Sequence, residues 1–250
     1  MKDGAPILRS ESSAYPSDAV PKNEPRSRYG NGPYYTVFGK TYKVLDSSYG
    51  YQQSGVASWY GTKFHGRRTS SGEPYDMYAM TAAHKSLPLP TYARVRNLNN
   101  NRSIIVRVND RGPFVDNRLI DLSYAAARKL DMIRDGTGLV EVTAISFDRA
   151  SPVETYEEKI SIIKNAANNP PKHANIFVQV GAFVDRRNAE RRLQWLEGKE
   201  IPGVFMGQEK NTDEQLYRVR IGPIVDVIHY DRIVTLLRRI GINETHLVTN

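Results

Sequence analysis

The sequence contains no cysteine among its 250 residues. A disulfide framework, a thiol nucleophile and a metal site built on cysteine are therefore excluded. The five histidines are scattered and lack the short spacings of histidine metal ligands. We therefore expect neither a metal site nor a bound cofactor.

Long hydrophobic runs are also missing. No stretch of roughly 18 or more apolar residues occurs, which is the length that a membrane-spanning helix needs. Residues 1–6 lack the apolar core of a signal peptide. We therefore expect a soluble chain, whose 40% hydrophobic content suffices for ordinary cores.

Acidic residues are in the minority, and the net charge is +8. Most of the excess lies between residues 54 and 147. A nucleic-acid-binding domain more often shows a dense basic stripe with a recognisable motif. The sequence shows neither, so nucleic acid is not an expected partner. The mild excess suits an anionic polymer such as the cell wall, or simply solubility.

Composition and periodicity divide the chain into four segments. Residues 1–33 are rich in Ser, Pro, Lys and Asn without periodicity, which predicts a disordered tail. Residues 34–147 contain short strands separated by turns, as in a mainly β domain. Residues 148–173 are polar, with two asparagines and two prolines near their end, and indicate a linker. Residues 174–250 form a second domain.

The last segment contains an internal repeat. Residues 176–183 and 217–224 align with an offset of 41 residues, and each strand is followed by a helical pattern. Two such units, completed by strands at 204–206 and 246–248, predict a small ferredoxin-like α+β fold. The alternation leaves one sheet face free of helices and able to bind a ligand.

The strand predicted at 103–110 ends in a carboxylate. Ile104, Val106 and Val108 share one face by period-two alternation, and Asp110 is expected on that face, just before a turn. A carboxyl group at the rim of an apolar face loses solvent, which favours its protonated form. A protonated acid near neutral pH is what cleavage of a glycosidic bond requires. Alternatively, the aspartate simply caps the turn.

Five motifs in this region closely resemble the rare lipoprotein A (RlpA) family: Gly55–Gly61, Phe64–Gly66, Thr81–His84, Asn109–Phe114 and Ile120–Ser123. The resemblance runs from about residue 34 to 147. It implies a double-psi β-barrel, similar to those of expansins and of a class of lytic transglycosylases. Residues 174–250 resemble the SPOR domain, which implies binding to glycan strands that have lost their peptide stems and are enriched at division septa.

The resemblance implies a lytic transglycosylase that cleaves MurNAc–GlcNAc bonds within peptidoglycan and leaves 1,6-anhydro ends. Asp110 is then the general acid and, once deprotonated, the base. Glu73 is a second acid/base or a stabiliser of positive charge on the sugar. His84 is expected to hydrogen-bond one of these carboxyl groups and tune it. Alternatively, Glu73 is an exposed loop carboxylate, and His84 is a structural histidine whose hydrogen bonds are made within the protein.

A groove around the acid is expected to bind the substrate. Asp121 matches a groove aspartate of expansins and is the second candidate for the acid, although a carboxylate before a helix start is favourable anyway. Two aromatic rings are expected to stack on sugar faces, those of Tyr60 and Tyr75. Two polar residues that flank the acid are expected to bind sugar oxygens, Asn109 and Arg111. The expected glycan-binding residues of the SPOR-like domain are Gln179, Phe183, Tyr217, Arg218 and Arg220.

A non-catalytic protein that binds or loosens glycan, as expansins do with the same barrel, is the alternative. The presence of Glu73, His84 and Asp110 favours the enzyme. Family members are usually lipoproteins anchored through an N-terminal cysteine, so we expect this chain to begin beyond that anchor. The resemblance implies action in the periplasm, as an outer-membrane lipoprotein enriched at the septum, with division proteins as candidate partners.

Overall fold

The structure, a computed structural model, describes residues 4–6, 16–147, 175–210 and 215–249. Contacts divide the chain into two compact units, Met1–Pro171 and Lys172–Asn250. The linker predicted at 148–173 lies outside the described residues. No helix in the described part is long and apolar enough to cross a membrane.

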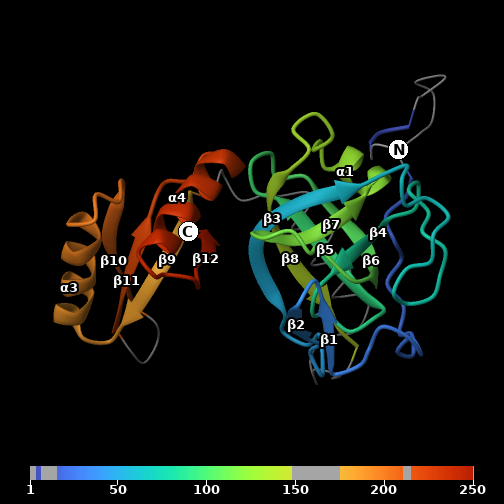
Figure 1. Cartoon of the computed structure of the whole chain (residues 1–250), viewed down its shortest axis with the longest axis horizontal. Helices are drawn as coiled ribbons and strands as arrows, with labels where there is room; N and C mark the ends of the chain where they lie inside the picture. The colour runs from blue at the N-terminus through green and yellow to red at the C-terminus, as the bar shows by residue number, and fades with distance from the viewer. Residues whose placement is uncertain (1–3, 7–15, 148–174, 211–214, 250) are drawn as a thin grey trace. The chain divides into compact units, whose positions relative to one another are not determined.

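A closed barrel of six strands forms the first unit (Figure 1). The strands are β3 (Gln52–Tyr60), β4 (Thr81–His84), β5 (Thr91–Asn97), β6 (Ser103–Asp110), β7 (Arg118–Ser123) and β8 (Gly138–Ile145). They follow the order β3-β7-β4-β6-β5-β8, and β8 pairs back with β3. The β3–β7 and β4–β6 pairs are parallel, and the other pairs are antiparallel. This is the expected double-psi topology.

Alternating apolar side chains fill the barrel. Ile104, Val106 and Val108 of β6 are buried, as the alternation predicted. They pack with Ala82 of β4 and Leu122 of β7. Burial of an aliphatic side chain of this size contributes roughly 1.5–3 kcal/mol. The interior face of β6 therefore fixes the register of the strands that carry the polar site.

Helix α1 (Tyr124–Lys129) follows β7, and Ser123 is its N-cap. The Ser123 hydroxyl accepts a hydrogen bond from Ala126 N (3.1 Å) and donates one to Ala79 O (2.6 Å). Ser123→Ala should therefore lower the free energy of unfolding by about 1–2 kcal/mol. Denaturant unfolding of both chains measures this difference, and coincident transitions would contradict it.

An aromatic hairpin precedes the barrel strands. It consists of β1 (Tyr34–Val37) and β2 (Lys40–Lys43). The rings of Tyr35 and Tyr42 stack with 5.2 Å between their centroids, and Tyr42 lies 5.6 Å from the ring of Phe114. The hairpin therefore packs on the turn that follows β6.

Residues 16–33 contact the barrel, which differs from the disordered tail predicted for 1–33. Ala19 N donates to Ile105 O (3.1 Å), and Ser27 N donates to Leu89 O (2.8 Å). These contacts use backbone groups and single side chains, so no apolar period marks them in the sequence. Residues 1–3 and 7–15 lie outside the described part.

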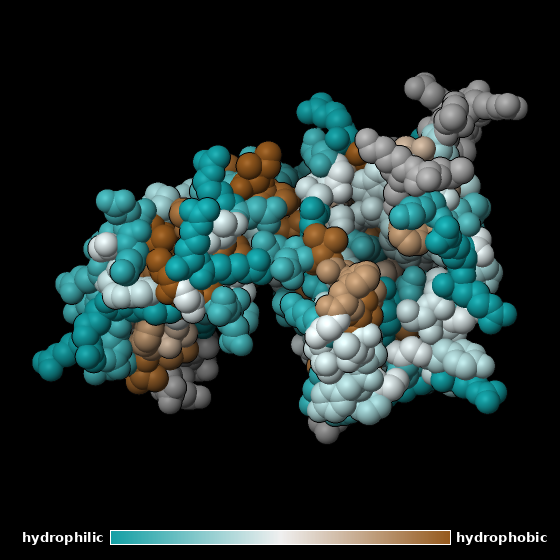
Figure 2. Space-filling view, viewed as in Figure 1, coloured by the Kyte–Doolittle hydropathy of each residue, from teal (hydrophilic) through white to brown (hydrophobic). Residues whose placement is uncertain are grey.

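The second unit is an antiparallel sheet with two helices. Its elements are β9 (Ile176–Phe183), α3 (Arg186–Glu197), β10 (Val204–Lys210), β11 (Gln215–Ile221), α4 (Val227–Arg239) and β12 (His246–Thr249). The strand order β10-β11-β9-β12 matches the predicted ferredoxin-like arrangement. The helices bury Ala189 and Leu196 of α3, and Ile233 and Leu237 of α4. The view of Figure 2 shows mostly hydrophilic side chains on each unit, with smaller hydrophobic areas.

Candidate active site

A tight turn at 69–73 carries two polar groups of the site. Thr69 N donates to Glu73 O (2.8 Å), and Gly72 N donates to Thr69 O (2.9 Å). Gly72 has a φ of +93°, and an added Cβ would lie 3.2 Å from an aromatic ring, so glycine suits this position. The turn thereby holds Ser70 and Glu73 beside the end of β6.

Asp110, the last residue of β6, is anchored through one oxygen only. Its Oδ1 accepts hydrogen bonds from Ser70 N, Ser70 Oγ and Arg111 N, each at 2.7 Å. Its Oδ2 has no hydrogen-bond partner within the described part of the chain. A carboxyl group held in this way presents its second oxygen at a fixed position, as a general acid requires.

A β-bulge decides the direction in which Asp110 points. Ala82 pairs with Val108, but the next residue, Ala83, pairs with Asp110, so Asn109 is the extra residue. Because paired residues share a face, Asp110 lies on the face of Ala83 and not on the interior face of Val108. The prediction that Asp110 continues the apolar face is therefore wrong.

Asp121 of β7 lies on this same face, on the other side of Ala83, with which it also pairs. The small side chain of Ala83 thus separates two carboxyl groups, each one strand spacing of about 4.8 Å away. Ser58 Oγ donates a hydrogen bond to Asp121 Oδ1. Burial raises the pKa of Asp121, against opposing contributions from Ser58 and nearby cations.

Glu73 is the carboxylate of the site that stays ionised. Its Oε2 accepts hydrogen bonds from Arg107 Nη1 (2.8 Å) and Asn109 Nδ2 (3.0 Å). Burial acts to raise the pKa of Glu73, but the two hydrogen bonds and the charge of Arg107 outweigh it, so the pKa lies below its usual value. A carboxylate in this state suits stabilisation of positive charge better than donation of a proton.

His84 does not contact the carboxyl groups, contrary to the prediction. Its side chain is 1% exposed. Nδ1 accepts hydrogen bonds from Ser86 N (3.2 Å) and Leu87 N (3.1 Å), and Nε2 lies 2.8 Å from the Tyr51 hydroxyl. Burial, aided by two nearby cations, lowers the pKa of His84 to about 3. His84 is thus a neutral residue that fixes the end of β4.

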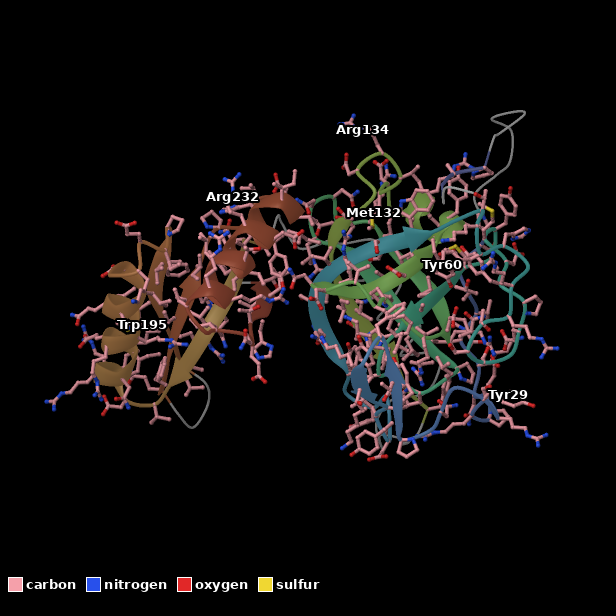
Figure 3. All side chains as sticks on the ribbon, viewed as in Figure 1. Tyr29, Tyr60, Met132, Arg134, Trp195 and Arg232 are labelled. Atoms are coloured by element: carbon pink, nitrogen blue, oxygen red, sulfur yellow. The ribbon has the colours of Figure 1, made fainter. Side chains whose placement is uncertain are left out.

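Tyr60 and Tyr75 form part of a buried cluster, which corrects the expectation that they stack on sugars. They are 8% and 2% exposed, and their rings stack on each other with 4.1 Å between centroids. The Tyr75 hydroxyl donates to Tyr60 O (2.6 Å). With Tyr124 and Met77 they pack around Ala83, and Figure 3 shows Tyr60 among the barrel strands. The cluster therefore supports the site from within.

Asn109 and Arg111 are also engaged inside the protein, so their expected contact with sugar oxygens is corrected. Both are buried. The amide of Asn109 holds Glu73. The guanidinium of Arg111 donates to Gly30 O (2.9 and 2.7 Å) and Leu87 O (2.5 Å). Both residues hold the parts of the site in place.

Sequence reasoning missed two residues that hold the carboxyl groups. Ser70 lies in a run of turn-forming residues before Glu73, which was the available signal. Arg107 alternates with the valines of β6 and resembles an ordinary solvent-facing charge. Only the fold shows that each binds a carboxylate. No group of three or more His, Asp or Glu side chains in the described ranges is placed to hold a metal ion.

The predicted glycan-binding residues of the second unit lie on both faces of its sheet. Gln179 pairs with Arg220, and Arg218 Nη1 donates to Gln179 Oε1 (3.3 Å). Tyr217 pairs with Phe183, and this pair lies on the other face because neighbours in a strand point in opposite directions. Arg220 is 7% exposed, so Gln179 and Arg218 are the more accessible polar groups of the set.

Comparison with known proteins agrees with a chain of two different units. Residues 52–142 match the family described as lytic transglycolase, and residues 172–244 match the SPOR domain. The fold and these matches define a lytic transglycosylase barrel followed by a SPOR domain.

Curated relatives narrow the class to one family. The endolytic peptidoglycan transglycosylase RlpA of Pseudomonas aeruginosa UCBPP-PA14 is 37% identical over 290 residues, which cover 99% of this chain and 84% of the relative. The protein of the same name from Neisseria meningitidis serogroup B MC58 is 51% identical over 210 residues, or 83% of this chain and 80% of the relative. The chain belongs to the RlpA family.

The apo expansin of Clavibacter michiganensis matches 70% of this chain and 80% of its own length, with 13% identity and a TM-score of 0.30. The fold assignment rests on the strand topology and the family match.

Proposed function

We propose that this chain is an endolytic transglycosylase that cleaves MurNAc–GlcNAc bonds of peptidoglycan and leaves 1,6-anhydro ends. The observation that carries the proposal is the geometry of Asp110, which has one oxygen fixed by three donors and the other open. The ionised Glu73, held on the turn that also anchors Asp110, supplies the second group that the reaction needs.

The reaction needs one proton donor and no water. Oδ2 of Asp110 gives its proton to the glycosidic oxygen as the bond to the anomeric carbon of MurNAc breaks. Positive charge develops on the sugar ring, and the carboxylate of Glu73 stabilises it. The 6-hydroxyl oxygen of the same MurNAc then bonds to the anomeric carbon, and its proton passes to Asp110. The acid is thereby regenerated.

Asp121 serves as a groove residue in this scheme. Its pKa is raised, so its carboxyl group retains a proton more readily than an exposed aspartate. A protonated carboxyl group is a hydrogen-bond donor as well as an acceptor. Asp121 can therefore bind a sugar oxygen beside the bond that breaks.

The second unit is proposed to select the substrate. Its match to the SPOR domain supports binding to glycan strands without peptide stems, with Gln179 and Arg218 as contacts. Such binding would bring the enzyme to the division septum. Attachment to the outer membrane through a lipid anchor is proposed from the family resemblance alone.

Isotopic labelling of the products tests the proposed reaction. Purified glycan strands without stems are digested in heavy-oxygen water, and the fragments are analysed by mass spectrometry. We expect anhydro ends that carry no heavy oxygen, because the new bond uses an oxygen of the sugar. Reducing ends that carry the label would show a hydrolase. Strands that sediment with the protein but stay intact would show the expansin-like binding protein.

A further inference from the structure

Arg107 lies between two carboxylates that are far apart in the sequence. Its Nη1 donates to Glu73 Oε2 at 2.8 Å. Its Nε and Nη2 donate to the two oxygens of Glu24, at 3.2 and 2.8 Å. The Tyr92 hydroxyl also donates to Glu24. The guanidinium that binds Glu73 is thus itself held by a bidentate contact with the carboxylate of Glu24, which precedes the barrel.

The same segment reaches the site at two further points. Gly30 O accepts two hydrogen bonds from the guanidinium of Arg111, the residue whose backbone N–H binds Asp110. Ser27 Oγ donates to Ser71 O (3.0 Å), within the turn at 69–73. Residues 24–31 therefore contact the supports of both proposed catalytic carboxyl groups.

We propose that residues 24–31 are a positioning element of the active site, and that Glu24 is a positioning residue that orients Glu73 through Arg107. This inference rests on the proposed function, since it assigns Glu73 a part in the reaction. An arginine side chain has many rotamers, and a single, partly exposed ion pair fixes it weakly. A bidentate contact with a carboxylate selects one orientation of the guanidinium. Without Glu24, the charge of Arg107 remains but its direction is no longer set.

A purely structural role is the competing explanation, and residues 16–33, which precede the barrel, offer a matched control. Asp18 also forms an ion pair with the barrel, with 2.7 Å between its Oδ1 and Lys129 Nζ. Asp18 lies outside residues 24–31, and no contact links Lys129 to the carboxyl groups of the site in the described structure. Glu24→Gln and Asp18→Asn therefore each remove one ion pair between residues 16–33 and the barrel, but only the first acts on Arg107.

The test compares the full-length chain with Glu24→Gln, Asp18→Asn, Arg107→Met and the double variant Glu24→Gln/Arg107→Met. Release of anhydro-ended fragments gives kcat and KM, and thermal unfolding gives Tm. We expect Glu24→Gln to lower kcat about tenfold, with KM changed less than about twofold. This loss is smaller than the roughly hundredfold cost of misplacing a reacting group by 1 Å, because Arg107 keeps its hydrogen bond to Glu73. Asp18→Asn should keep the kcat of the parent chain while shifting Tm about as much as Glu24→Gln.

The double variant supplies a readout that stability alone would not move. If Glu24 acts through Arg107, Glu24→Gln should have almost no effect on kcat once Arg107 is methionine. Full kcat in Glu24→Gln, an equal loss in Asp18→Asn, or additive losses in the double variant would each overturn the inference. Failure of the proposed function would be seen separately, as absence of anhydro fragments from the parent chain.

Discussion

Asp110→Asn should abolish turnover while leaving the chain folded. The amide oxygen of asparagine accepts the same hydrogen bonds from Ser70 and Arg111 that Oδ1 of Asp110 accepts. At the position of Oδ2, however, it presents an NH₂ group that does not release a proton near neutral pH. General acid–base catalysis contributes about 10²–10⁴ in rate, and here one group serves both proton transfers. We therefore expect kcat to fall by about 10³ or more.

Release of anhydro-ended fragments over time measures this loss, and Asp116→Asn is the matched control. Asp116 is exposed and lies 3.7 Å from Lys40 in a surface ion pair, six residues beyond Asp110. The control removes the same charge from the same stretch of chain and should keep full activity. If Asp110→Asn kept more than a tenth of the activity, the acid would have to be another group, and Asp121→Asn would then be the variant to examine.

The parts of the fold that depend on local patterns followed from the sequence. Period-two alternation correctly placed Ile104, Val106 and Val108 in the barrel core. The alternation of residues 176–183 and 217–224 likewise placed two strands of the second unit, β9 and β11. The internal repeat led to the ferredoxin-like unit, because each repeat is a strand followed by a helix.

The details of the candidate site depended on contacts between distant segments. A bulge at Asn109 reverses the face on which Asp110 lies, and alternation has no means of indicating an extra residue. Arg111 was expected to bind the substrate. In the structure its guanidinium donates hydrogen bonds to Gly30 O, in a segment that shows no hydrophobic periodicity in the sequence. Polar residues beside a reacting group are as often its supports as its ligands, and sequence spacing does not separate the two.

His84 is the clearest example of a polar residue that supports the site without contacting its carboxyl groups. The titration of His84 should change the stability of the barrel with pH. Burial lowers its pKa from 6.5 to about 3. Between these values the unfolded chain binds a proton on this ring that the folded chain does not bind. The stability contributed by neutral His84 is therefore complete above pH 6.5 and is lost as the pH falls toward 3. At about pH 4.5 the loss should reach roughly 2–3 kcal/mol, since one pKa unit corresponds to about 1.4 kcal/mol.

Comparison with His84→Gln isolates this contribution, because every other titrating group is common to the two chains. Both are made with Trp195→Phe, so that Trp59 is the remaining tryptophan and its fluorescence reports on the barrel. Near neutral pH the variant should be less stable by about 1–3 kcal/mol, since it loses buried hydrogen bonds. Near pH 4.5 the difference should shrink or change sign, because glutamine does not titrate. If both chains lost stability equally as the pH fell, His84 would not be a buried neutral histidine. If His84→Gln kept its stability but lost turnover, His84 would take part in the reaction itself.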